Sequence, residues 1–346
     1  MEENISVGIS HGDFNGIGYE VILKTFSDVR MFERITPIIY GSLKVASYHK
    51  KNLGLENVVL TGIRKAEEAN YKKLNIITCI DENIRVEMGK LSSSAGLAAF
   101  NALERSVADL KDGKIDVLVT APINKQSIQS NSFQFPGHTE YLAEKLGSKE
   151  YLMLMVSEEM RIGMVTCHTP LSSVPGLITM DSIIQKIKIF HQSLIYDFGI
   201  RRPRIAVLSL NPHAGDNGLL GKEELEIIQP AIKAAVEEKL IVLGPYGADG
   251  FFGSSHYRKF DGILAMFHDQ ALIPFKAISM EKGVNFTAAL PFVRTSPAHG
   301  TAYEIAGKNQ ASHLSFTEAV FTACDIFEKR KMHKEITANP LPHVEV

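Results

Sequence analysis

Three histidines each follow directly on an apolar run of residues typical of a buried strand. In open α/β sheets, ligands bind beyond the carboxyl ends of the strands, where these side chains would lie. Three imidazoles gathered there suit a divalent cation, with coordination positions left open for water or substrate. Each histidine alone could equally end a strand or pack in a loop. The three are His168 after 162–167, His213 after 205–212 and His268 after 263–267.

A second segment has residue types that suit an anion. Gly137, His138 and Thr139 stand just before the helix-like stretch 141–146. The first N–H groups of a helix and the positive end of its dipole attract phosphate or carboxylate. Ordinary capping by Thr139 is the alternative. His138 offers a further donor beside the same helix start and favours anion binding.

Lys276, Asn285 and Arg294 surround the apolar run 286–292. Arginine pairs with phosphate or carboxylate through two parallel hydrogen bonds, whereas lysine supplies a point charge. Either cation could instead be a solvated surface residue. Arg294 is the favoured ligand, because the run before it has the composition of a buried strand.

Two further segments remain ambiguous. Asp249 stands in the loop 244–250 (GPYGADG), where it could act as a general acid or base or simply form a turn. The glycine-rich stretch 8–18 lies between a predicted strand and a helix, as a phosphate loop does. It lacks both the GxGxxG register and a GKS/T ending, so a Rossmann or P-loop assignment would be weak.

Composition sets the outer limits. A chain of 346 residues suggests about two domains, with hydrophobic residues at 45% and charged residues at 22% as in globular proteins. A net charge of −2 indicates neither a nucleic acid nor a membrane partner. The acidic start and the absence of a long apolar run lead us to expect a cytoplasmic protein. Three isolated cysteines (79, 167 and 324) direct any metal to histidine.

The elements that must position these residues follow an α/β pattern. Short β-branched runs alternate with helix-like stretches, which predicts mostly parallel sheets flanked by helices. In the stretch 94–110, Leu97, Phe100 and Leu103 fall on one apolar face. The predicted strands are 6–10, 36–40, 57–60, 74–80, 116–120, 151–156, 162–166, 204–210, 262–267 and 286–290. The predicted helices are 94–110, 181–196, 222–238 and 315–331.

Taken in order, several motifs resemble the 4-hydroxythreonine-4-phosphate dehydrogenases of vitamin B6 biosynthesis, over nearly the whole chain. A second likeness supports the fold: 299–308 (HGTAYEIAGK) is similar to the adenosine-binding loop of the isocitrate and isopropylmalate dehydrogenases, and 12–20 to their N-terminal glycine turn. The motifs are Gly12-Asp13 with 16–18 (GIG), 120–125 (TAPINK), 137–140 (GHTE), 210–215 (LNPHAG), 265–270 (AMFHDQ), 283–285 (GVN) and 290–296 (LPFVRTS).

The resemblance implies a two-domain fold like that of isocitrate and isopropylmalate dehydrogenase, with the active site in the cleft between the domains. One domain would comprise 1–110 with 275–346 and carry the cofactor-binding loop at His299, Gly300 and Thr301. The other, 111–274, would carry the metal ligands and the dimer contacts. A homodimer with its metal site at the subunit interface is also implied.

The implied activity is oxidation of 4-phosphooxy-L-threonine at C3 by NAD or NADP, followed by decarboxylation to 3-amino-2-oxopropyl phosphate. His168, His213 and His268 would ligate zinc, magnesium or cobalt, and three imidazoles favour zinc or cobalt. The residues carried over as substrate ligands are His138, Thr139, Lys276, Asn285 and Arg294. Asp249 would accept the hydroxyl proton.

This chain departs from the family pattern near its N-terminus, where Phe14, Asn15 and Tyr19 replace proline, alanine and proline. These changes leave the proposed metal and phosphate residues intact but could alter the shape of the loop. A related dehydrogenase acting on D-threonate or D-erythronate 4-phosphate is therefore the close alternative. A transferase resembling the phosphate acetyltransferases, which share a related fold, is a further one.

Overall fold

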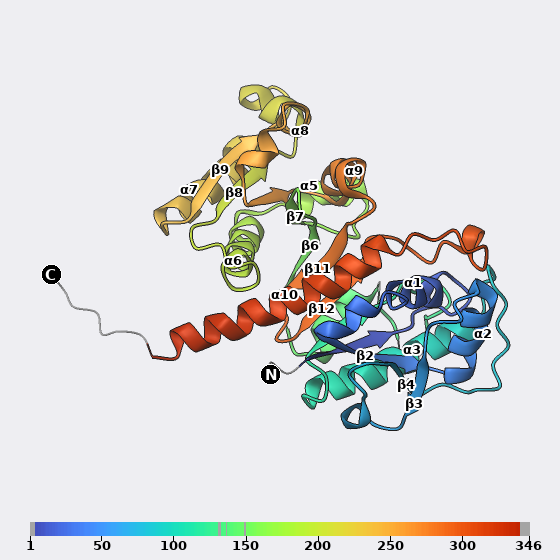
Figure 1. Ribbon diagram of the computed structural model, residues 1–346. Helices are drawn as coiled ribbons and strands as arrows, with labels where there is room; N and C mark the ends of the chain where they lie inside the picture. The colour runs from blue at the N-terminus through green and yellow to red at the C-terminus, as the bar shows by residue number, and fades with distance from the viewer. Residues whose placement is uncertain (1–3, 131–132, 136, 149, 340–346) are drawn as a thin grey trace. The chain divides into compact units, whose positions relative to one another are not determined.

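The computed structural model describes residues 4–130, 133–135, 137–148 and 150–339 (Figure 1). The ends of the predicted terminal domain, 1–3 and 340–346, and Pro136, which precedes the predicted anion-binding segment, lie outside the described residues. The chain divides into two compact units, each built from two segments. The first is Met1–Glu150 with Ser279–Cys324, and the second is Tyr151–Ile278 with Asp325–Val346.

These boundaries differ from those that the sequence predicts, after residues 110 and 274. The segment 111–150 belongs to the first unit, because strand β5 (Val117–Thr120) pairs in parallel with β1 (Ile5–Ser10). The end of helix α10 (Leu314–Thr337) belongs to the second unit. There Arg330 Nε donates a hydrogen bond of 2.6 Å to Asp197 Oδ1.

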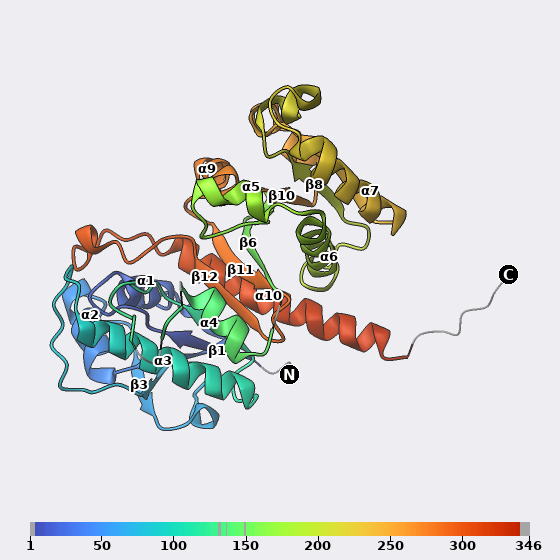
Figure 2. The ribbon, with the colours of Figure 1, turned by 180° about the vertical axis from the view of Figure 1, so that it is seen from behind.

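The first unit holds seven described strands in the order β3-β4-β2-β1-β5-β12-β11 (Figures 1 and 2). All neighbouring pairs are parallel except β11 and β12. The other strands are β2 (Ile35–Gly41), β3 (Leu60–Ile63), β4 (Leu74–Thr78), β11 (Val284–Ala288) and β12 (Val293–Pro297). The helices are α1 (Gly18–Thr25), α2 (Leu43–Leu53), α3 (Ser93–Lys111), α4 (His138–Lys145) and the start of α10, with short turns η1 (Val29–Glu33), η2 (Ala66–Glu68) and η7 (Tyr303–Ile305).

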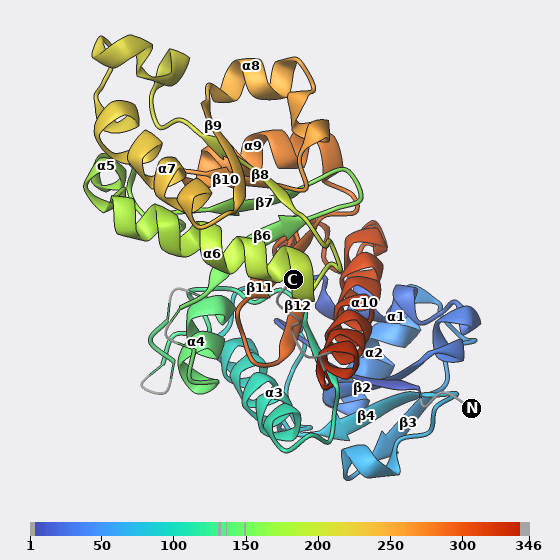
Figure 3. The same cartoon turned by 90° about the vertical axis from the view of Figure 1, so that its left-hand side faces the viewer.

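The second unit holds the strand order β6-β7-β10-β8-β9, parallel except for β6 and β7. Figures 1 and 3 show α6 and α7 on one face of these strands and α8 and α9 on the other. The strands are β6 (Leu152–Val156), β7 (Arg161–Met164), β8 (Arg204–Leu208), β9 (Ile241–Tyr246) and β10 (Gly262–Ala265). The helices and turns are α5 (Val174–Leu177), α6 (Met180–Tyr196), α7 (Gln229–Glu237), α8 (Ala248–Gly253), α9 (His268–Ser279), η3 (Leu171–Ser173), η4 (Pro212–Gly218), η5 (Glu224–Ile228) and η6 (His256–Lys259). None of the helices in the described ranges combines the length and apolar character that crossing a membrane requires.

The α/β prediction is confirmed, with local differences. Strands β9 and β12 have no counterpart among the predicted strands, and the strand predicted at 57–60 begins only at Leu60. The predicted helix 222–238 consists of a π-helical turn, η5, followed by α7. Leu97 is 57% exposed, because α3 buries a narrower stripe rich in alanine, including Ala98 and Ala102.

A stack of three buried rings links the end of β1 to α1 and α2. His11 and Tyr19 lie 5.2 Å apart between ring centroids, and Tyr19 and His49 lie 5.1 Å apart. The Tyr19 hydroxyl also accepts a hydrogen bond of 3.2 Å from the backbone N–H of Ser42. Tyr19, which replaces the family's proline, is therefore an integral part of this core.

Burial of the two histidines has a consequence for acid stability. Desolvation lowers the pKa of His11 to about 3, with His49 contributing, and lowers the pKa of His49 to about 4. The folded state thus keeps both imidazoles neutral at a pH where the unfolded chain protonates them. Their contribution to stability is complete above about pH 6.5 and is lost as the pH falls toward the folded pKa values.

We expect His49→Gln to reduce the acid sensitivity of the fold. Between pH 7.5 and 5, the loss of unfolding free energy should be smaller than in the wild type by about 2 kcal/mol, because one titrating group is gone. Urea unfolding at the two pH values measures this difference. His333→Gln, on α10, is the control and should keep the wild-type pH dependence. An unchanged pH dependence in His49→Gln would contradict the prediction.

Candidate active site

A buried arginine anchors the first unit's polar site. Arg294, the second residue of β12, is 2% exposed, and its Nε and Nη2 atoms donate to Thr120 Oγ1 at 3.1 and 2.6 Å. Its third nitrogen, Nη1, is buried without a hydrogen-bond partner among the residues that the structure describes. Burial lowers the pKa of Arg294 to about 10, against an opposing effect of Glu140, so the side chain remains a cation at neutral pH.

His138 lies within electrostatic range of this arginine. Burial lowers its pKa well below the usual value, and the charges of Arg294 and Lys125 lower it further. Its Nε2 atom is buried and has no hydrogen-bond partner. The imidazole is therefore neutral at physiological pH, and an anion would find Arg294, Lys125 and a histidine nitrogen close to one another.

The sequence predicts a helix from residue 141, but α4 begins three residues earlier, at His138. Gly137 is its N-cap and supplies no side-chain hydrogen bond, so Thr139 lies inside the first turn and does not cap it. The capping alternative for Thr139 is therefore wrong. The first N–H groups of α4 retain the capacity to bind an anion.

Asn285 shares a face of the sheet with Arg294. The antiparallel register of β11 and β12 pairs Asn285 with Ser296, two residues from Arg294. Asn285 Oδ1 is buried and lacks a hydrogen-bond partner. Lys276, by contrast, is exposed on α9 in the second unit. Thr120 and Lys125 are the first and last residues of the motif 120–125. The sequence prediction gave neither of them an individual role.

The predicted cofactor loop packs on the glycine turn. Thr301 O accepts a hydrogen bond of 3.0 Å from Ile17 N, and a Cβ at position 16 would lie 2.7 Å from the same oxygen, so glycine is required there. The Tyr303 hydroxyl donates to Asp13 Oδ2 at 2.6 Å. His299 Nδ1 lies 3.1 Å from Gly300 O. The structure thus brings together the two segments that carry the isocitrate-dehydrogenase likeness.

Asn15 connects this turn to a further loop. Its Nδ2 donates to Lys90 O at 3.0 Å and to Ser92 Oγ at 3.2 Å, and its Oδ1 accepts from Glu87 N at 2.8 Å. The family's alanine would make none of these side-chain contacts. The substitution therefore joins the loop 87–92 to the glycine turn.

In the second unit, His168 and His268 line one pocket of about 460 Å³. Their ring centroids lie 6.0 Å apart, and His268 Nδ1 is 2.7 Å from Asp269 Oδ1. A carboxylate at Nδ1 leaves Nε2 available as a metal ligand and orients the ring. The lining residues are Cys167, His168, Thr169, Pro170, Leu171, Val174, Phe267, His268 and Asp269.

Parallel pairing explains why these histidines meet. Strands β7, β10 and β8 are consecutive parallel neighbours, so His168, His268 and His213 all follow the same edge of the sheet. Beyond the named strands, Thr166 Oγ1 donates to Met266 O at 2.8 Å and extends the β7–β10 pairing. Gln270 Nε2 donates to Ser209 O at 2.6 Å and connects the ends of β10 and β8.

His213 lies in a strained turn. Residues 213–217 all have positive φ, and four of the five are not glycine. Buried Glu224 holds the entrance to this turn: Oε1 accepts the N–H groups of Leu210 and Asn211, each at 2.8 Å, and Oε2 accepts Asn211 Nδ2 at 3.0 Å. Glu224 had no role in the sequence prediction, because nothing in its local pattern distinguishes it from its neighbour Glu223.

Gly247, two residues before Asp249, lies beside the same turn. A Cβ on Gly247 would be 3.9 Å from His213 Cα and 3.4 Å from Asp249 Oδ1. Across residues 4–339, apart from the positions not described, no three His, Cys, Asp or Glu side chains are arranged as a metal site. The structure therefore shows His168 and His268 as neighbours, and the three-histidine site stays a prediction.

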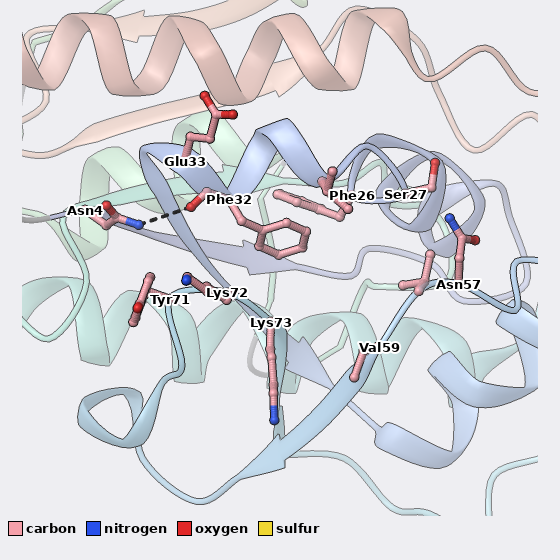
Figure 4. A pocket seen from close by; sticks show the side chains of 12 residues that line it. Asn4, Phe26, Ser27, Phe32, Glu33, Asn57, Val59, Tyr71, Lys72 and Lys73 are labelled. Carbon is pink, nitrogen blue, oxygen red and sulfur yellow. Dashed lines mark hydrogen bonds between the residues drawn. The ribbon is translucent and has the colours of Figure 1, made fainter.

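A second pocket, of about 380 Å³, contains none of the predicted site residues (Figure 4). Asn4, Val59 and Lys73, which line it, immediately precede β1, β3 and β4, so it lies at the amino ends of these strands. Ligands in open α/β sheets bind at the opposite, carboxyl ends. We therefore do not connect this pocket with the candidate active site.

The family model for the pyridoxal phosphate biosynthetic protein PdxA matches residues 33–323. The chain belongs to this family. The 4-hydroxythreonine-4-phosphate dehydrogenase of Bacteroides thetaiotaomicron is 55% identical over 343 residues, covering 99% of this chain and 94% of that protein. The D-threonate 4-phosphate dehydrogenase of Cupriavidus necator is 39% identical over 328 residues, covering 94% of this chain and 98% of that protein.

Solved structures agree with the fold. The 4-hydroxythreonine-4-phosphate dehydrogenase of Klebsiella pneumoniae superposes with a TM-score of 0.81 at 32% identity, covering 94% of this chain and 98% of that one. Isocitrate dehydrogenase of Methylococcus capsulatus gives a TM-score of 0.50 at 10% identity, covering 96% and 89%. The predicted likeness to the isocitrate dehydrogenase fold is confirmed, and the chain is a member of an oxidoreductase family.

We expect Glu224→Ala to destabilise the second unit far more than Glu223→Ala. Removing Glu224 leaves the N–H groups of Leu210 and Asn211 without their acceptor, so the free energy of unfolding should fall by about 3 kcal/mol. Among the described residues, Glu223 accepts a side-chain hydrogen bond only from Asn211 Nδ2, and its removal should cost about 1 kcal/mol or less. Urea unfolding compares the two, and equal losses would contradict the assigned role of Glu224.

Proposed function

We propose that this protein oxidises 4-phosphooxy-L-threonine at C3 and releases carbon dioxide, giving 3-amino-2-oxopropyl phosphate for pyridoxal 5′-phosphate synthesis. The observation that carries the proposal is the set of buried polar atoms without partners in the first unit. Arg294 Nη1 and His138 Nε2 offer nitrogens to a phosphate beside a permanent positive charge, and Asn285 Oδ1 offers an acceptor to the substrate's ammonium or hydroxyl group. Unsatisfied buried groups of this kind require an explanation, and a phosphorylated substrate supplies one.

Within this site each residue has a distinct task. Arg294 would form charge-assisted hydrogen bonds with the phosphate, and the first N–H groups of α4 would add further donors at His138 and Thr139. Asn285 would contribute an amide group on the same face. Holding a remote phosphate in this way uses binding energy to orient the reacting carbon. Lys276 remains a substrate ligand that the resemblance predicts.

We further propose that His168, His213 and His268 hold a divalent cation. The donor set fits this role, because two imidazoles share one pocket and the Asp269 carboxylate orients one of them. Held by these residues, a cation would supply positive charge that favours loss of the C3 hydroxyl proton and stabilises negative charge during decarboxylation. Zinc or cobalt suits imidazole ligands better than magnesium does.

A dehydrogenase of this family implies a nicotinamide cofactor that accepts the hydride from C3. The loop of His299, Gly300 and Thr301 is our candidate for part of its site, supported by close packing on the glycine turn at Gly16. Asp249 is the candidate acceptor of the hydroxyl proton, supported by its place two residues after Gly247, which lies beside the His213 turn. The homodimer, its interfacial metal site and the cytoplasmic location stay predictions.

The alternative substrates are the 4-phosphates of D-threonate and D-erythronate. Two relatives, at 38% and 39% identity, are named Putative D-threonate 4-phosphate dehydrogenase and D-threonate 4-phosphate dehydrogenase. Proteins that share more than a third of this sequence are therefore named for a sugar-acid substrate. The relative at 55% identity is named 4-hydroxythreonine-4-phosphate dehydrogenase, which favours 4-phosphooxy-L-threonine as the substrate. Family membership also favours a dehydrogenase over the transferase alternative.

We expect NADH or NADPH production from 4-phosphooxy-L-threonine, and its loss when a chelator removes the divalent cation. Absorbance at the reduced-nicotinamide band measures turnover, with D-threonate 4-phosphate and D-erythronate 4-phosphate as parallel substrates. Restoring activity with added zinc or cobalt is the control for damage by the chelator. Robust turnover of a sugar-acid phosphate without turnover of the amino substrate would overturn the proposal.

We expect Asp269→Asn to weaken cation binding by about 10- to 100-fold, because His268 loses the carboxylate that orients its ring. Titration calorimetry of the chelator-treated protein with zinc or cobalt measures the affinity without reference to turnover. Asp181→Asn, an exposed change in the first turn of α6, is the matched control and should bind as the wild type does. Equal affinities in the two variants would contradict the role of Asp269.

A further inference from the structure

A row of buried polar side chains crosses three neighbouring strands of the first unit. The parallel register pairs Ser10 of β1 with Thr120 of β5, and Leu118 of β5 with Arg294 of β12. Because side chains alternate along a strand, Thr120 shares the face of Leu118 and therefore of Arg294. All three polar residues are buried, at 2% exposure or less.

Thr120 makes both of the hydrogen bonds that the structure shows for the Arg294 guanidinium. Nε and Nη2 donate to the single Oγ1 atom at 3.1 and 2.6 Å. A guanidinium is planar and rigid, so holding its Nε–Nη2 edge also sets the direction of Nη1. Nη1 is the nitrogen that stays buried without a partner. The hydroxyl of Thr120 therefore decides which edge of the arginine remains available to a ligand.

Glu140 is a second possible partner for Arg294. Its carboxylate interacts favourably with the charged form of Arg294, and it lies in the same first turn of α4 as His138. An arginine released from Thr120 would have a neighbouring acid toward which to turn. Pairing with Glu140 would neutralise the positive charge of Arg294 and so weaken its attraction for an anionic ligand.

We propose that Thr120 is a positioning residue for anion binding: it holds the Nε–Nη2 edge of Arg294 so that Nη1 faces the bound phosphate. The identity of the anion as the substrate's phosphate rests on the proposed function. Thr120 acts through Arg294 and needs no contact with the substrate. Two neighbouring hydroxyls, of Ser10 and Thr287, are also buried without partners, as expected for the lining of a site that a ligand completes.

Thr120→Val tests the proposal, because valine keeps the shape of the side chain and removes the hydroxyl that accepts both arginine hydrogen bonds. We expect the KM for the phosphorylated substrate and the Ki of inorganic phosphate each to rise about tenfold, with kcat changed less than about threefold. Thr120→Ser restores the hydroxyl and should return both constants to near the wild-type values.

Thr295→Val is the matched control on β12. Thr295 is equally buried, and its hydroxyl donates to Ala319 O at 2.7 Å, but it lies on the opposite face from Arg294. Its substitution should lower thermal stability without changing the Ki of phosphate. An unchanged Ki in Thr120→Val, or a Thr120→Ser variant as impaired as Thr120→Val, would overturn the role of Thr120.

The same variants separate this inference from the proposed function. Calorimetric binding of inorganic phosphate to the wild type and to Thr120→Val needs no turnover. If the wild type binds phosphate and Thr120→Val binds it about tenfold more weakly, the positioning role holds even where 4-phosphooxy-L-threonine is not oxidised. If the wild type oxidises that substrate and both proteins bind phosphate equally, the proposed function holds and the positioning role fails.

Discussion

The buried positive charge of Arg294 is the constraint on which the first unit's site depends. Removing a guanidinium from water is costly unless hydrogen bonds and opposite charge compensate for it. Thr120 supplies two of those hydrogen bonds, and Glu140 supplies favourable electrostatics. The compensation is incomplete at Nη1, and a phosphate would complete it. Stability without a ligand and affinity for an anion are therefore properties of the same few contacts.

Parallel strand pairing serves both units in the same way. In the first unit it aligns the ends of β1 and β5, and in the second it aligns the ends of β7, β10 and β8. Side chains that follow these strands share one edge of a sheet although they are distant in the sequence. Hydrogen bonds beyond the strand ends, such as those of Thr166 and Gln270, extend that alignment to His168 and His268.

Residues outside the family pattern find their explanation in packing. Tyr19 belongs to the ring stack with His11 and His49, and Asn15 connects the glycine turn to the loop 87–92. Neither the His49 contact nor the loop contact could be predicted from the sequence, because His49 lies 30 positions from Tyr19 and the loop lies at least 72 positions from Asn15. Glu224 was not predicted either, because its local sequence resembles that of its neighbour Glu223. Of the two, it is the buried Glu224 that accepts the backbone N–H groups of Leu210 and Asn211.

By itself the sequence determined the α/β class, the family and the residue types available for phosphate and metal, because periodicity and motifs are local properties of the chain. It also marked Arg294 as the favoured anion ligand, since the apolar run before it predicts a buried strand. Only the tertiary structure decided that Thr120 holds this arginine, that α4 begins at His138 and that residues 111–150 join the first unit. Those outcomes depend on strand register and on the cost of burying charge, which arise only when distant segments pack together.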